Sequence, residues 1–97
     1  MVLAIATIPC QGGKLKYAVI PEDGFVPNEK TAVAIAIAIL LPVYGKKQID
    51  SEMPFRATLK GDVWTVSGYL PKGDEGGVAI VEISKNDGRI IRMNHEQ

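Results

Sequence analysis

The chain has 97 residues, of which 46% are hydrophobic and 23% charged. This length and balance are typical of one folded globular domain, so we expect a single domain over residues 1–97 that is ordered over most of its length. Eleven lysine and arginine residues balance eleven acidic ones, which leaves no long-range field to attract nucleic acid or an anionic membrane. Neither is therefore expected as a partner.

The first 26 residues read as an N-terminal strand or hairpin segment. Two strand-like runs, residues 2–8 and 14–20, flank Gly12-Gly13, and a two-residue glycine loop is a hairpin signal. Cys10 is the single cysteine, which excludes an internal disulfide and favours a buried thiol. We therefore expect either a single strand or an extra hairpin ahead of the main fold.

The apolar start of the chain lacks the positively charged lead-in of a signal peptide. The longest apolar run, residues 31–44, contains a proline and is too short to span a membrane. We expect a soluble, cytoplasmic protein, or a periplasmic one if an upstream signal is missing from this sequence.

The second segment covers residues 27–95. It is predicted to begin with a helix that ends at about Tyr44. Asn28 is a capping residue, Glu29 is an acid suited to the first turn, and Gly45 follows the end. Residues 32–41 alternate between alanine and larger aliphatic residues, which is also a strand's period. The caps and the alanine content favour the helix.

Two hairpins follow whose registers can be tested against their turns. A two-residue loop at Gly61-Asp62 gives one apolar and one polar face. The cross-strand pairs it predicts are Phe55 with Gly68, Arg56 with Ser67, Ala57 with Val66, Thr58 with Thr65, and Leu59 with Trp64.

The second hairpin turns at Asn86-Asp87-Gly88. A three-residue loop with a left-handed Gly88 keeps apolar residues opposite one another, whereas a two-residue loop does not. The pairs it predicts are Val81 with Met93, Glu82 with Arg92, and Ile83 with Ile91. Residues 71–77 form a glycine-rich, acidic connection between the hairpins.

The fold class predicted from these elements is α+β, with one helix packed on a curved antiparallel sheet of about four strands. The sheet face toward the helix should be filled by Phe55, Leu59, Trp64, Val66, Val81 and Ile83. We therefore expect a packed core and no open hollow with converging ionisable groups.

The sequence offers no catalytic set. His95 is the single histidine and lies near the end of the chain, so no metal cluster of cysteine and histidine can form. The serines lack a nucleophile-elbow motif. Asp50 and Glu52 are an acid pair, but such pairs in loops are usually exposed surface acids. We expect no catalytic residue, no metal site and no cofactor.

Several ordered motifs can be read together across the second segment. They are Pro27-Asn28-Glu29-Lys30-Thr31-Ala32, Tyr44-Gly45, Pro54-Phe55, Trp64, Leu70-Pro71-x-Gly73, Gly76-Gly77, Glu82-Ile83 and Asp87-Gly88. From about Pro27 to His95 the chain resembles bacterial immunity proteins with a nuclear transport factor 2 fold, which are encoded beside polymorphic toxins. The resemblance implies a reduced, cystatin-like form of that fold and a protein that binds and neutralises a cognate toxin.

Two sets of residues are candidate contacts. The acids Asp50, Glu52, Asp74 and Glu75 would meet a basic cleft of the toxin, on grounds of charge and expected exposure. Ala34, Ile37 and Leu41 lie on what should be the wet face of the helix, where relatives tend to carry lysine and glutamate near positions 34 and 37. An apolar face there needs a cover, so we expect it to be buried in a homodimer or against the toxin.

Two alternative functions stay open. A cone-shaped fold can enclose a pocket for a small ligand or a reaction, with Tyr44, Tyr69 and His95 as its polar groups. A cystatin-like protease inhibitor would instead use the loop at residues 71–77 as a wedge.

Overall fold

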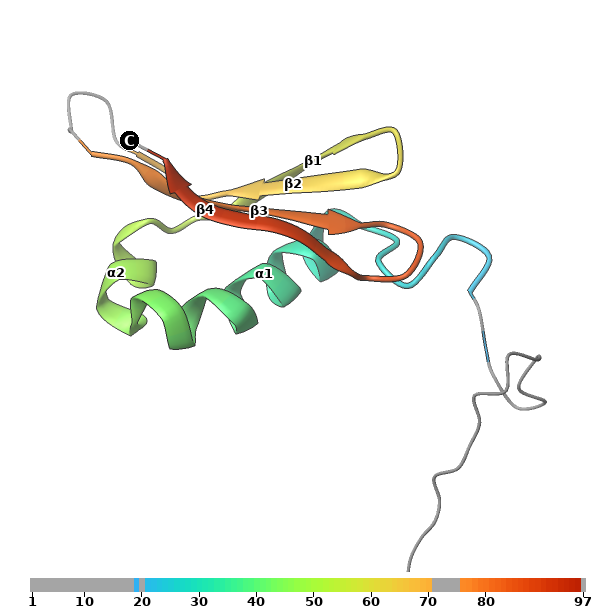
Figure 1. Ribbon diagram of the computed structural model, residues 1–97, viewed down its shortest axis with the longest axis horizontal. Helices are drawn as coiled ribbons and strands as arrows, with labels where there is room; N and C mark the ends of the chain where they lie inside the picture. The colour runs from blue at the N-terminus through green and yellow to red at the C-terminus, as the bar shows by residue number, and fades with distance from the viewer. Residues whose placement is uncertain (1–18, 20, 71–75, 97) are drawn as a thin grey trace, which may run out of the picture.

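The computed structural model of the protein describes residues 19, 21–70 and 76–96 (Figure 1). The expected N-terminal strand or hairpin, Cys10, and the acids Asp74 and Glu75 lie outside these residues. In chain order the elements are α1 (Glu29–Tyr44), α2 (Lys46–Ser51), β1 (Arg56–Lys60), β2 (Val63–Ser67), β3 (Val78–Ser84) and β4 (Ile90–Glu96). The two helices lie on one face of a single sheet (Figure 1), which confirms the predicted α+β class.

Helix α1 begins and ends where its capping residues predicted. The Oδ1 atom of Asn28 accepts a hydrogen bond from the Thr31 amide at 2.9 Å, and the Gly45 amide donates to the Leu41 carbonyl at 2.8 Å. Gly45 has a φ of 86°, a conformation that glycine adopts without steric strain. The alternation of alanine with larger aliphatic residues is thus helical, as the caps indicated.

One face of α1 is fully buried. Ala32, Ala36 and Leu40 recur every fourth residue and have no exposed surface, which is the spacing of one helix face. The two alanines let the helix backbone approach the sheet closely, because a methyl group occupies little of the space between the layers. The remaining aliphatic residues flank this face, so most of them are only partly covered.

The short helix α2 was not predicted, because residues 46–51 read as a connection to the first hairpin. It begins directly after Gly45, and the Ile49 amide donates to the Gly45 carbonyl at 3.1 Å. Ile49 is completely buried. A single buried isoleucine therefore holds this turn of helix on the core, a tertiary effect that local propensity does not reveal.

The sheet has the order β1-β2-β3-β4, and all neighbours are antiparallel. The register predicted from the Gly61-Asp62 loop is confirmed for the four pairs from Arg56 with Ser67 to Leu59 with Trp64. Leu59, however, was expected in the core and is 40% exposed. The end of this hairpin reaches past the first turn of α1 (Figure 1), so no helix covers that part of the sheet.

The second hairpin matches its prediction in the centre and departs from it at the turn. Val81 pairs with Met93 and Glu82 with Arg92 as expected, but Ile83 pairs with Ile90 instead of Ile91. The Ser84 amide donates to the Arg89 carbonyl at 2.8 Å, and the Gly88 amide donates to the Ser84 carbonyl at 2.9 Å. These bonds close a longer loop, and the register shifts between Glu82 and Ile83 to absorb the extra residue.

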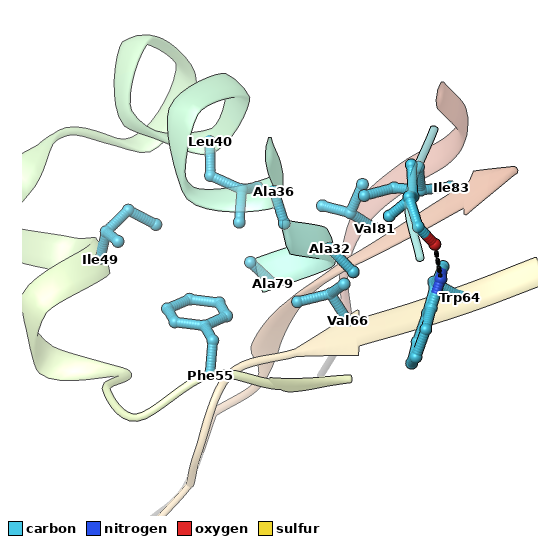
Figure 2. Close-up of a cluster of buried hydrophobic side chains, with 11 residues drawn as sticks. Ala32, Ala36, Leu40, Ile49, Phe55, Trp64, Val66, Ala79, Val81 and Ile83 are labelled. Carbon is cyan, nitrogen blue, oxygen red and sulfur yellow. Dashed lines mark hydrogen bonds between the residues drawn. The ribbon is translucent and has the colours of Figure 1, made fainter. Parts of the chain in front are cut away.

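The core lies between α1 and the sheet, and Trp64 closes one end of it (Figure 2). Its indole Nε1–H donates to the Val26 carbonyl at 2.8 Å, shown dashed in Figure 2. The Val26 amide donates in turn to the Lys85 carbonyl at 3.0 Å. Trp64 is therefore the core anchor that was predicted, and it also fixes the segment that leads into α1.

An ionic contact ties the start of α1 to the edge strand β1. Glu29 accepts hydrogen bonds from the Arg56 guanidinium at 2.7 Å and from the Ala57 amide at 2.9 Å. The Arg56 guanidinium, and then the Ala57 amide, lower the pKa of Glu29. The carboxylate also occupies an amide of β1 that faces no neighbouring strand, which protects that edge from pairing with another chain.

Candidate functional site

An open hollow of about 460 Å³ lies where α1 ends and α2 begins. It is lined by Val43 and Tyr44 from the last turn of α1, Gln48 from α2, and His95 from the end of β4. Figure 1 shows the last residues of β4 at the same end of the molecule as α2. The break in the helix at Gly45 and the length of β4 together bring these side chains to one place.

A buried acid, Glu52, lies behind the hollow. Its side chain is only 4% exposed, and its carboxylate accepts three hydrogen bonds. Oε1 accepts from the Ala79 amide at 2.7 Å, and Oε2 accepts from Gln48 Nε2 at 2.7 Å. The third partner is Nε2 of His95, 3.0 Å from Oε2. A buried carboxylate with this many donors is well satisfied.

These contacts decide the charge of Glu52. Burial alone raises its pKa, because a low-dielectric environment disfavours the charged form. The hydrogen bonds from Ala79, Gln48 and His95 act in the opposite direction and outweigh burial, so the pKa of Glu52 is held below its ordinary value of 4.5. Glu52 is therefore a carboxylate at neutral pH.

His95 is oriented by this carboxylate. An ionised carboxylate can only accept, so Nε2 of His95 must carry a proton. The other ring nitrogen, Nδ1, makes no hydrogen bond within the described part of the chain. The ring also packs against Tyr44, with the ring centroids 5.3 Å apart and the planes inclined at 50°. Among the residues that the structure describes, His95 thus has Nε2 hydrogen-bonded to Glu52 and Nδ1 without a partner.

The predicted acidic contacts have different fates. Asp50 is exposed as expected and pairs with Lys46, with Nζ 2.5 Å from Oδ2. Glu52 was expected to be exposed and is buried. Its side chain is hydrogen-bonded as described above, and its backbone carbonyl accepts a hydrogen bond from the Tyr69 amide at 2.7 Å. Asp74 and Glu75 lie outside the described residues. The acids predicted as one set are therefore not one surface.

Tyr44 and His95 line the hollow, whereas Glu52 lies behind them and does not belong to its lining. Sequence reasoning missed Gln48 and treated His95 as an isolated terminal residue. The spacing of Gln48 and Glu52, four residues apart, was a usable signal, because i,i+4 residues share a helix face. Nothing local in the sequence indicated that the end of β4 would reach this point.

The predicted helix face is only partly open. Ala34 is exposed, whereas Ile37 and Leu41 are half-buried and pack against the core. Ile37, Leu41 and Tyr44 follow i, i+4, i+7 spacing, so they lie on the same side of α1 as the hollow. Tyr69, the third polar group of the alternative pocket, is exposed and does not line the hollow.

The arrangement can hold and orient a ligand, and a histidine backed by a carboxylate can also move a proton. In the described residues no three histidine, cysteine, aspartate or glutamate side chains are grouped to hold a metal ion. None of the helices in this part of the chain has the length and apolar character to cross a membrane.

Comparisons with known proteins point to one family. The family profile described as NTF2 fold immunity protein matches residues 31–97. The uncharacterised protein YhhH of Escherichia coli (strain K12) is 35% identical over 81 residues, which are 82% of this chain and 61% of that protein. The uncharacterised protein YbbC of the same strain is 33% identical over 83 residues, 84% of this chain and 66% of that protein.

The chain thus spans a little under two thirds of the length of these relatives. No solved structure matches it significantly. The profile covers more than half of the chain, including nearly all of α1 and the entire sheet. This chain therefore belongs to the NTF2 fold immunity proteins.

Proposed function

We propose that the protein binds a cognate bacterial toxin and keeps it inactive by occluding its working surface. The observation that carries the proposal is the family match, which includes every strand and both helices from Thr31 onward. The structure is compatible with a binding role, because a packed hydrophobic core supports an open hollow that is backed by the buried acid Glu52. A rigid scaffold with an accessible, chemically distinct surface is suited to recognition.

The contact surface that we propose is the end of the molecule formed by the hollow and α2. Asp50 is exposed there and pairs with Lys46. A cationic side chain of the partner could replace Lys46 in this exposed ion pair. Asp74 and Glu75 stay proposed contacts on charge alone. In this scheme acids of the immunity protein meet a basic cleft in the toxin.

The helix face of Ala34, Ile37 and Leu41 is a second proposed contact, either with the toxin or with a second copy. Ile37 and Leu41 contribute to the core, so a charge at either would disturb the fold as well as association. Ala34 is the cleaner position because it is exposed. Ala34→Glu should weaken association without changing stability by more than about 0.5 kcal/mol.

The test is co-expression with the toxic domain encoded by the neighbouring reading frame. The wild-type chain should restore growth and co-purify with that domain. Failure of both, with the protein folded and abundant, would contradict the proposal. Size-exclusion chromatography of wild type and Ala34→Glu shows whether the helix face binds the toxin or a second copy. If wild type is a dimer and Ala34→Glu is a monomer, the face binds a second copy.

The Glu52–His95 pair favours a second candidate, a small-ligand binder or enzyme. The pair lies at an open hollow beside Tyr44, and such a combination is a common setting for proton transfer. If His95→Gln and Tyr44→Phe retained full protection against the toxin but lost binding of a small molecule, this candidate would replace the first.

A further inference from the structure

The hollow presents hydrogen-bond acceptors. The Gln48 amide nitrogen is used by Glu52, which leaves its Oε1 atom for a ligand. Nδ1 of His95 is an acceptor whenever the ring is neutral, since Nε2 carries the proton. The Tyr44 hydroxyl can also accept. Within the described residues, neither Gln48 Oε1 nor the Tyr44 hydroxyl makes a hydrogen bond.

The hollow also has a negative charge behind it, the carboxylate of Glu52. Glu52 is ionised, and its one ion-pair partner in the described part of the chain is His95, which is charged only when doubly protonated. In α2, Lys46 pairs with Asp50 and not with Glu52. While the His95 ring is neutral, an anion entering the hollow would therefore be repelled by the Glu52 carboxylate, whereas a cation would be attracted.

The walls suit a basic side chain with an aliphatic stem. Val43 is 55% exposed and apolar, and Tyr44, which also lines the hollow, has an aromatic ring of the kind that makes cation–π contacts. Arginine and lysine place their methylenes on apolar surface and their charge at a polar end. The volume of about 460 Å³ is ample for one such side chain.

We propose that the hollow receives an arginine or lysine side chain of the partner toxin, with Glu52 as the buried counter-charge and His95, Gln48 and Tyr44 as acceptors. This inference rests on the proposed function. In this proposal Glu52 does not touch the toxin as an exposed residue, which the sequence suggested. It acts through Gln48 and His95, which line the hollow.

The chemistry is tested first on the free protein, by NMR titration of the full chain at pH 8. The probes are N-acetyl-arginine methylamide, the uncharged N-acetyl-norleucine methylamide, and acetate. The arginine probe should give saturable shifts at the Gln48 side-chain amide and the His95 ring. Equal binding of the norleucine probe, preferential binding of acetate, or no saturable shift would overturn the proposal.

Substitutions test whether Glu52 supplies the negative charge that attracts the arginine probe. Glu52→Gln should weaken the arginine probe roughly tenfold, since it removes the counter-charge at short range. Glu82→Gln is the matched control, because Glu82 pairs with Arg92 on the opposite face of the sheet, and it should bind the probe like wild type. Gln48→Lys changes an exposed residue of α2 and places a permanent positive charge next to Glu52. It should abolish probe binding, and wild-type affinity in Gln48→Lys would overturn the assignment.

The toxin is tested separately so that the two proposals can fail independently. If the wild-type chain gives no protection on co-expression, the proposed function fails, and with it the toxin as occupant, while the titration still decides the chemistry of the hollow. If wild type protects and Gln48→Lys protects equally at equal abundance, the function stands and the toxin does not use the hollow. Protection by wild type that Gln48→Lys loses supports both.

Discussion

Gly68 and Glu52 are in such close contact that no larger residue fits at position 68. A Cβ atom built on Gly68 would lie 2.5 Å from Oε1 of Glu52 and 2.8 Å from its Cβ atom. The Gly68 amide donates to the Ala79 carbonyl at 3.1 Å, and the Ala79 amide donates to Glu52. The absence of a side chain at Gly68 is thus what lets the carboxylate reach the sheet.

Gly68→Ala should destabilise the protein by about 2–3 kcal/mol, the range for overpacking a close-packed site. The new methyl group must displace the Glu52 side chain, so the histidine NMR signals of His95 should change as well. Urea unfolding followed by Trp64 fluorescence measures the loss.

Gly61→Ala is the comparison, because Gly61 has open space around it and only a left-handed φ of 62°. It should cost about 1 kcal/mol through backbone strain and leave the His95 signals unchanged. Equal losses in the two variants, with His95 unaffected in both, would show that Gly68 does not position Glu52.

Replacing Glu52 should make stability less dependent on pH in the acid range. Its folded-state pKa is lowered, so ionised Glu52 stabilises the fold fully above its unfolded pKa, and this contribution is lost as the pH falls through the folded-state pKa. Glu52→Gln should therefore be about 2 kcal/mol less stable than wild type at pH 7, the size typical of hydrogen bonds to a charged group.

The difference between wild type and Glu52→Gln should narrow as the pH falls below 4.5, the ordinary pKa of the group. Urea titrations at a series of pH values measure it. Glu82→Gln, which breaks an exposed pair with Arg92, should differ from wild type by less than about 1 kcal/mol. A gap for Glu52→Gln that stayed constant with pH would mean that its charge does not matter.

Trp64→Phe should loosen the segment that precedes α1. The substitution removes the indole donor and leaves the buried Val26 carbonyl without that partner, at a cost of about 1–3 kcal/mol. Hydrogen exchange of the Phe25 and Val26 amides, which bond to the Asn86 and Lys85 carbonyls, should quicken relative to amides in the centre of β3. Unchanged relative exchange would contradict the anchoring role.

Two leucine substitutions in α1 test which face meets the sheet. Ala36 is fully buried and Ala38 is exposed. Ala36→Leu should destabilise by about 1–3 kcal/mol because the helix cannot move away without opening the core. Ala38→Leu should lie within about 0.5 kcal/mol of wild type. Thermal or urea unfolding of the two variants settles the orientation, and the reverse ranking would disprove it.

The sequence by itself determined the elements whose signals are local. Asn28 and Gly45 delimit α1 because capping acts within one turn. The Gly61-Asp62 loop fixes the register of β1 with β2 because a two-residue turn leaves no freedom in pairing. The aliphatic strands then required a cover, and α1 was the element available, so the α+β class followed.

The tertiary structure alone decided what depends on distant residues. Ile49 is buried in the hydrophobic core, which stabilises the unexpected α2. A bond between Gly88 and Ser84 reset the pairing of Ile83. Glu52 is buried because Ala79, 27 residues later, and His95, 43 residues later, supply its donors. A carboxylate that looks exposed in sequence becomes a buried charge only when the fold brings its partners to it, because desolvation is tolerated where hydrogen bonds replace water.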